Sequence, residues 1–153
     1  MTIRLSTGLR NLLASSAGFS GAFANGVIYI YSGTQPTTPD AAATGTLLGV
    51  VTANGLPFAF GATTNGLNFD APIGGVVSKN AAVPWCYTGL ASGTAGWFRL
   101  MGNASDNLGA STTLSRMDGS LSTTGADLNM SNTSLAVGTP GTIDVFQFTI
   151  PGQ

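Results

Sequence analysis

Short apolar runs separated by turn-forming residues are the feature that most limits what this chain can fold into. They are clearest from Trp97 to Pro151, where three apolar or alternating runs are separated by Gly, Asn, Asp, Ser and Thr. Strands are short, and short β-type runs bounded by turn residues are typical of all-β domains. The pattern therefore predicts a domain built from many short strands.

The same texture begins at Gly26. The run Val27–Tyr31 is β-branched and aromatic at every position, which predicts a strand buried on both sides. Pro36 and Pro39 predict a loop over 34–44, since proline cannot donate to a strand ladder. Further strands are expected at Thr46–Thr52, Leu56–Phe60, Gly75–Ser78, Trp85–Thr88, Gly96–Met101, Met117–Leu121, Asp127–Met130 and Ile143–Ile150. In the last of these, Phe146 and Phe148 are expected to point inward.

Turn dipeptides separate these runs. Asn54-Gly55 lies between two apolar runs and is the strongest hairpin signal in the chain, because Asn-Gly suits the backbone of a two-residue hairpin turn. Asn65-Gly66 is a second turn signal, and Asp118-Gly119 is interpreted as a third.

The first residues have the spacing of a helix. Leu5, Leu9, Leu12 and Leu13 fall on one helical face, Ser6 or Thr7 could cap its start, and Gly18 and Gly21 would end it. Two roles remain open. The helix packs on the core of its own domain, or it forms an arm that docks on a neighbouring subunit. The interface residues of such an arm would be Arg4, Leu5, Leu9, Arg10, Leu12 and Leu13.

These elements together predict an all-β fold, a β-sandwich or jelly roll of about eight strands with a short N-terminal helix or arm. A chain of 153 residues suits one domain. We expect an N-terminal helix or arm over 1–25 and a single β-sandwich domain over 26–153.

Charge is scarce along the whole chain. Five Lys and Arg, six Asp and no histidine give a net charge of −1, and only 7% of residues are charged. The arginines are too scattered for the basic stripe that nucleic acid binding needs, and no apolar run is long enough to span a bilayer. We therefore expect neither a nucleic acid nor a membrane as partner. A weakly charged surface favours association with other protein.

The residues that usually perform catalysis are missing or have ordinary explanations. Without histidine the common serine triad is excluded, and the lone Lys79 has no supporting motif. Aspartates in Gly- and Asn-rich loops are typical of turns. Asn103, Asp106 and Asn107 are of the type that binds calcium, but they lack the spacing of an EF-hand. We predict no enzyme, no catalytic residue, no cofactor and no metal site.

Three aromatic residues have two interpretations. Trp85, Tyr87 and Trp97 lie in expected strands, where aromatic side chains usually belong to the core. If they were exposed together, they would form a stacking platform for a glycan. The exposure of their rings distinguishes these interpretations.

Several segments of the chain resemble a module found in small structural proteins of tailed bacteriophages. The segments are Gly96–Arg99, Asp118–Ser120, Thr124–Met130, Asn132–Ser134 and Asp144–Thr149, and Met1–Leu13 and Gly26–Gly33 look similar to the same group. Within that group, the size and character of the chain are most similar to the capsid cement, or decoration, proteins of short-tailed phages.

The resemblance implies a function without catalysis. It implies a homo-oligomer in the virion, assembled in the host cytoplasm, that binds the outer face of the major capsid protein shell and stabilises it against internal DNA pressure. It supplies no motif that assigns contact residues. The alternative is a tail, collar or fibre-associated phage protein that attaches to a host glycan through Trp85, Tyr87 or Trp97.

Overall fold

The computed structural model describes residues 3–150 and is mostly β, with 37% of residues in strands and 8% in helices. Its sheets are antiparallel for the most part, and a short helix stands near the N-terminus. The predicted all-β class is confirmed, and the arrangement is consistent with a β-sandwich.

The elements follow one another in this order: β1 (Arg4–Leu5), α1 (Thr7–Leu13), α2 (Gly18–Ala22), β2 (Val27–Ser32), β3 (Leu47–Ala53), β4 (Val76–Ser78), β5 (Trp85–Thr88), β6 (Gly93–Met101), β7 (Arg116–Ser122), β8 (Leu128–Asn129), β9 (Ser134–Leu135), β10 (Pro140–Ile143) and β11 (Gln147–Thr149). The main sheet has the order β1-β7-β6-β2-β3-β5-β10, while β8 pairs with β7 and β9 pairs with β6.

Strand β2 lies near the middle of the main sheet, between β6 and β3. Ile28 pairs with Leu100 of β6 and Val51 of β3, and these three side chains are fully buried. Side chains alternate between the two faces of a strand, so these residues and their neighbours Ile30 and Phe98 form the core face of the sheet.

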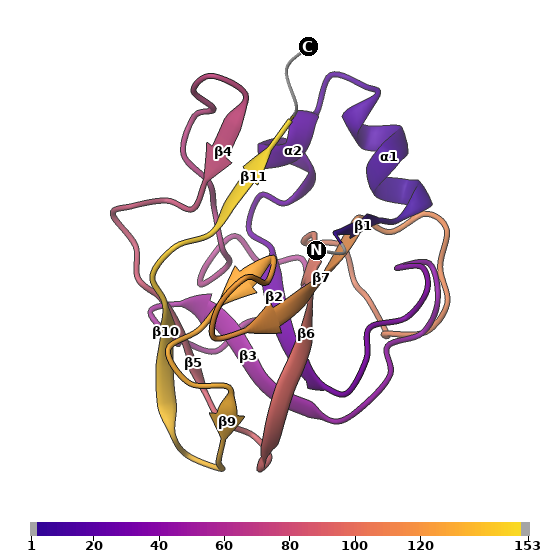
Figure 1. Ribbon diagram of the computed structural model, residues 1–153. Coiled ribbons are helices and arrows are strands. Elements are labelled where there is room, and N and C mark those ends of the chain that lie inside the picture. Colours follow the sequence, from indigo (N-terminus) through magenta and orange to yellow (C-terminus); the bar gives the residue numbers. More distant parts are fainter. Residues whose placement is uncertain (1–2, 151–153) are drawn as a thin grey trace.

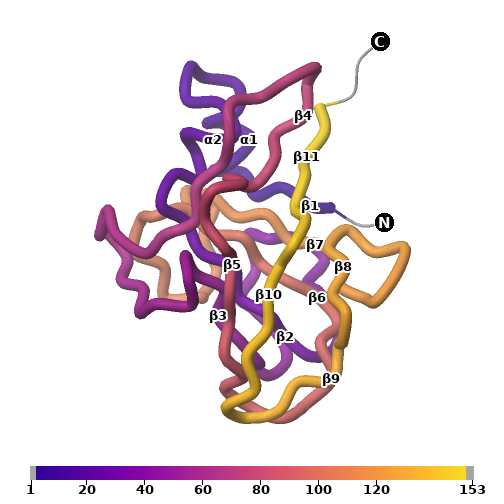
Figure 2. The backbone as a smooth tube through the Cα atoms, turned by 90° about the vertical axis from the view of Figure 1, so that its left-hand side faces the viewer, coloured from indigo at the N-terminus to yellow at the C-terminus, as the bar shows by residue number. Residues whose placement is uncertain are grey.

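A smaller two-stranded sheet of β4 and β11 lies beside the helices at one end of the molecule (Figure 1). In Figure 2 the last part of the chain runs from β10 in the lower half to β11 in the upper half. The ring of Phe19 in α2 stacks on Phe148 of β11, with ring centroids 4.5 Å apart. This contact joins the helices to the smaller sheet.

The N-terminal segment belongs to the same core. β1 pairs with β7, and Leu9, Phe19 and Phe23 are buried in the core cluster. The segment expected as an N-terminal helix or arm over 1–25 thus holds both helices, and its described residues pack on the core of the domain expected over 26–153. Residues 1–2 and 151–153 of those ranges lie outside the described part of the chain.

The predicted first helix forms, but it is shorter than expected. α1 begins after Ser6, whose side chain accepts a hydrogen bond from Leu9 N at 3.1 Å, as an N-cap residue does. It ends at Leu13. Gly18 does not end this helix but begins α2, and Leu5 lies in β1 rather than in the helix.

The segment Leu56–Phe60 is not a strand. Asn54 and Gly55 do turn the chain with positive φ values of 57° and 68°, yet β3 pairs with β5 rather than with the residues that follow the turn. Pro57 cannot donate to a ladder, and the Thr52 hydroxyl donates to Leu56 O at 2.7 Å. The predicted hairpin was therefore wrong, although its turn is present.

Asp118-Gly119 is not a turn but lies inside β7. Gly119 faces the core, where an added Cβ atom would come within 2.6 Å of Cε1 in the Phe98 ring. A glycine is needed because the aromatic ring packs directly on the backbone.

The expected strand Ile143–Ile150 is divided into two. Ile143 ends β10 opposite Trp85, whereas Phe148 in β11 pairs with Val77 of β4. The chain therefore changes sheets within the run. The predicted inward direction is nevertheless confirmed, since Phe146 is buried and Phe148 packs against the core.

Candidate functional site

The residues predicted for a docking arm pack mainly on their own domain. Leu9 is fully buried, and Leu5 and Leu13 pack against the core. The guanidinium of Arg4 donates to the carbonyl oxygen of Pro36. The interpretation of a helix packed on its own core therefore describes these residues, and Leu9 is inaccessible to a neighbouring subunit. Of the set, Arg10 is exposed and Leu12 is half-buried.

The aromatic residues predicted for a glycan platform are buried. Trp85 is 1% exposed, Tyr87 8% and Trp97 0%. Trp85 packs edge to face with Phe69, while Trp97 stacks on Tyr31 with ring centroids 4.6 Å apart. The three rings present no open face, so they do not form the platform.

Two buried ion pairs occupy the face of the main sheet opposite the core. The guanidinium of Arg99 donates to both carboxylate oxygens of Asp118, at 2.7 and 2.8 Å, and both side chains are fully buried. Arg116 donates to both oxygens of Asp106 at 2.7 and 2.5 Å. Bidentate pairs of this kind fix the orientation of both side chains.

The same arginines hold the loop 33–46 on the sheet. Arg99 Nη1 donates to Ala41 O and Arg116 Nη1 donates to Pro39 O, each at 3.2 Å. Between these two residues, the carboxylate of Asp40 accepts from the backbone N and the hydroxyl of Thr7 at 2.8 and 2.6 Å. We call Arg99, Asp118, Arg116, Asp106 and Asp40 the polar clamp. It ties the loop, the sheet and the start of α1 together.

Burial changes the ionisation of groups in and beside the polar clamp. Burial raises the pKa of Asp118, and the hydrogen bonds from Arg99 only partly offset this effect. Burial also raises the pKa of Tyr31 to about 12, against a smaller lowering by the charge of Arg99. The hydroxyl of Tyr31 has no hydrogen-bond partner within the described chain. Asp118 is held by its two hydrogen bonds from Arg99, and Tyr31 is held by stacking on Trp97.

The second half of this face of the sheet is only partly covered and carries no charged residue. Tyr29 pairs with Arg99 on one side and with Val50 on the other, so the three side chains form a row that leads out of the polar clamp. Beyond the clamp, the row opens into a shallow pocket of about 320 Å³. We call its half-buried and exposed apolar side chains the outer face: Tyr29, Val50, Leu56, Phe58 and Leu90. Leu56 is 48% exposed and Leu90 54%.

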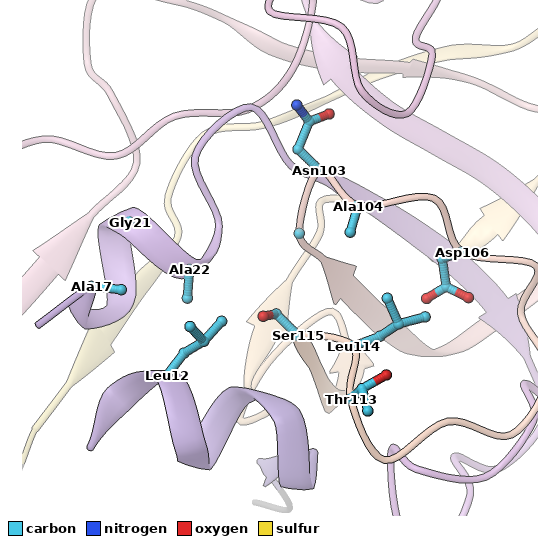
Figure 3. A pocket seen from close by; sticks show the side chains of 11 residues that line it. Leu12, Ala17, Gly21, Ala22, Asn103, Ala104, Asp106, Thr113, Leu114 and Ser115 are labelled. Carbon is cyan, nitrogen blue, oxygen red and sulfur yellow. The ribbon is translucent and has the colours of Figure 1, made fainter. Parts of the chain in front are cut away.

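A smaller pocket of about 240 Å³ lies between the two helices and the loop 102–115, which joins β6 to β7 (Figure 3). Leu12 and Ala22 extend into it from α1 and α2. Two of its polar residues are engaged elsewhere: Asp106 binds Arg116, and the amide of Asn103 accepts from Gly61 N and donates to Ala62 O. The pocket is a space between packed elements, and Asp106 is the one charged residue of its lining.

The loop residues considered for calcium are used for local structure. Asp106 also accepts from Leu108 N at 2.7 Å, and Asn107 accepts from Gly109 N at 3.0 Å. Within residues 3–150 no three His, Cys, Asp or Glu side chains are grouped as metal ligands would be. Neither helix of that part has the length and apolar character needed to cross a membrane.

Comparison with known proteins identifies no relative. No protein-family model matches the chain, and no curated protein or solved structure matches it either.

Sequence patterns missed the polar clamp because its members are distant in the chain. Arg99 and Asp118 become partners only through the register of β6 and β7, in which they lie directly opposite each other. One signal was present: Arg99 is a charged residue inside the apolar run Gly96–Met101, which is expected to be a strand. Such a residue is buried only with a partner.

Proposed function

We propose that this chain is a capsid cement protein of a tailed bacteriophage. It binds the outer surface of the major capsid protein shell as a homo-oligomer and stabilises that shell. The resemblance of its sequence segments to small phage structural proteins supports this proposal, and so do the properties of the outer face.

The composition and exposure of the outer face are the main structural support for the proposed capsid binding. Its half-buried and exposed aromatic and aliphatic side chains line one shallow pocket, and no charged residue is part of that lining. Apolar groups gathered on a surface are typical of protein contact sites, and the centres of protein interfaces are poor in charge and rich in aromatic residues. The surface therefore suits another protein better than a charged small molecule.

The polar clamp suits the mechanical role. Its buried bidentate Arg–Asp pairs orient the two arginines, which donate to carbonyl oxygens of the loop 33–46. Asp40 of that loop accepts two hydrogen bonds from Thr7 at the start of α1. A rigid body loses little conformational entropy when it binds. Since cement proteins attach at many equivalent places, modest contacts of single copies add up over the shell.

Glycan attachment has less support. It depended on Trp85, Tyr87 and Trp97, and all three rings lie in the interior.

The direct test uses shells of the parent phage that lack this protein. Purified protein should bind these shells and raise the temperature at which they are disrupted. The double substitution Leu56→Asp with Leu90→Asp places two charges on the outer face and should abolish binding while the protein stays folded. Ile73→Asp is the matched control, because Ile73 is an 82% exposed apolar residue next to β4 and away from this face.

The possible binding results lead to different conclusions. If the unchanged protein does not bind the shells, the proposed function is wrong. If the unchanged protein and both variants bind equally, the function stands, but the outer face is not the contact surface.

A further inference from the structure

Three Asn-Gly dipeptides occur in the chain, at Asn25-Gly26, Asn54-Gly55 and Asn65-Gly66. Asparagine followed by glycine is chemically labile because the unhindered glycine nitrogen can attack the asparagine side chain. All three asparagines have a positive φ, of 53°, 57° and 63°. The sign of φ therefore does not distinguish the reactivity of the three asparagines. Their hydrogen bonds and burial do.

Asn25-Gly26 is held at both reacting groups. The side-chain oxygen of Asn25 accepts from the amide of Asn68 at 3.1 Å. The nitrogen of Gly26 donates to Phe23 O and to Leu67 O, at 3.0 and 3.1 Å. Gly26 is also buried, and an added Cβ atom would lie 2.4 Å from Met101 O. The Gly26 nitrogen cannot approach the Asn25 side chain without losing these hydrogen bonds and moving the backbone against Met101.

Asn65-Gly66 is held at the side chain and by burial. The Asn65 amide donates to Pro57 O at 2.7 Å. Gly66 is buried directly against the backbone of Asn25, since an added Cβ atom would lie 2.5 Å from its carbonyl carbon. The leaving amide group is thus restrained, and the attacking nitrogen has no room to move.

Asn54-Gly55 has neither restraint. Both residues are exposed, and the side chain of Asn54 makes no hydrogen bond within the described residues. The nitrogen of Gly55 makes one bond, to Thr52 O at 3.3 Å, which is longer than a typical N–H···O bond. The dipeptide is at the tip of a turn whose following segment joins no strand.

We propose that Asn54 is a site of spontaneous deamidation, and that the fold protects Asn25 and Asn65 from the same reaction. The nitrogen of Gly55 gives up its proton and bonds to the Asn54 side-chain carbonyl carbon, and the amide leaves as ammonia. Water then opens the resulting succinimide at either carbonyl and leaves aspartate or isoaspartate at position 54. No enzyme and no other reactant is needed. The reaction adds a negative charge beside the uncharged outer face, whose pocket Gly55 also lines. This inference does not depend on the proposed function.

The test is incubation of the folded protein in mildly alkaline buffer, followed by peptide mapping with mass spectrometry. Trypsin leaves all three dipeptides in one peptide, because no Lys or Arg lies between Arg10 and Lys79. A protease that cleaves after aromatic residues separates them. We expect position 54 to gain the mass of the amide-to-acid exchange about tenfold faster than positions 25 and 65, a factor that two ordinary hydrogen bonds can supply.

Two controls, unfolding in denaturant and the Asn68→Ala variant, test whether the fold sets these rates. In denaturant the three rates should become similar, since their local sequences all contain Asn-Gly. Asn68→Ala removes the bond to the Asn25 side chain and should raise the rate at Asn25 without changing that at Asn54. Rates at 25 or 65 in the folded protein that equal or exceed that at 54 would overturn the proposal, as would an intact position 54 under conditions that modify the unfolded chain.

Discussion

The polar clamp and the outer face occupy two halves of one side of the same sheet. The row Asp118, Arg99, Tyr29 and Val50 crosses both, strand by strand. At one end the side chains are charged, fully buried and covered by the loop 33–46, and at the other they are uncharged and open. Buried charges thus bind one half of this surface to the loop 33–46, while the other half stays uncharged and open. In the proposed function, this open half is the part that contacts the shell.

The first prediction concerns the most deeply buried part of the clamp. Asp118→Ala leaves the guanidinium of Arg99 buried without its partner, which should lower the free energy of unfolding by about 3–5 kcal/mol. Denaturant unfolding measures the change. Asp144→Ala is the matched control: its exposed carboxylate accepts from the Thr142 hydroxyl, and its loss should cost less than about 0.5 kcal/mol. Equal effects of the two substitutions would show that the clamp does not stabilise the fold.

The second prediction concerns pH. The pKa of Tyr31 is raised from 10.0 to about 12 by burial, so the unfolded chain loses this proton first as the pH rises. Stability should therefore fall between pH 10 and pH 12, by about 2 kcal/mol from this residue. Tyr31→Phe should remove that part of the decline. Because it also removes a buried hydroxyl that has no partner within the described chain, it should cost little at neutral pH. Identical alkaline profiles for the two proteins would refute this account.

The third prediction concerns the link between the loop and the first helix. Asp40→Ala removes the acceptor of two bonds from Thr7 and should destabilise the protein by about 1–2 kcal/mol. Thr37→Ala, at an exposed position in the same loop, should have almost no effect. Hydrogen exchange of the first turn of α1 would localise the change. Unchanged protection there would show that Asp40 does not hold the helix.

The fourth prediction has the smallest effect on stability. Leu56→Asp with Leu90→Asp changes side chains that are already about half exposed, so unfolding should shift by no more than about 0.5 kcal/mol for each. A loss of several kcal/mol would mean that the outer face belongs to the core of the chain and is not a free surface.

Local sequence patterns predicted the strands and the helix cap of this fold. Strands such as Val27–Tyr31 and Trp85–Thr88 were found because β-branched and aromatic residues report local preference directly. The cap at Ser6 was likewise a local signal. The class of the fold follows from such local patterns.

Pairings between distant residues could not be found in this way. Asp118-Gly119 has the composition of a turn, yet it lies in a strand. Asp118 forms an ion pair with Arg99, and Gly119 leaves space for the ring of Phe98. Leu56–Phe60 has the composition of a strand, yet no strand of the structure pairs with it. The outer face was missed for the same reason, since Tyr29, Val50 and Leu90 meet only after the sheet has formed.

The most direct test of the proposed function is an electron-microscopy map of the intact phage particle that contains this chain. The account predicts density for the β domain on the outer surface of the shell, in copies related by the shell's symmetry, with Tyr29, Leu56 and Leu90 turned toward the neighbouring protein. Density for the chain in the tail, collar or fibres instead, with the shell bare, would contradict it.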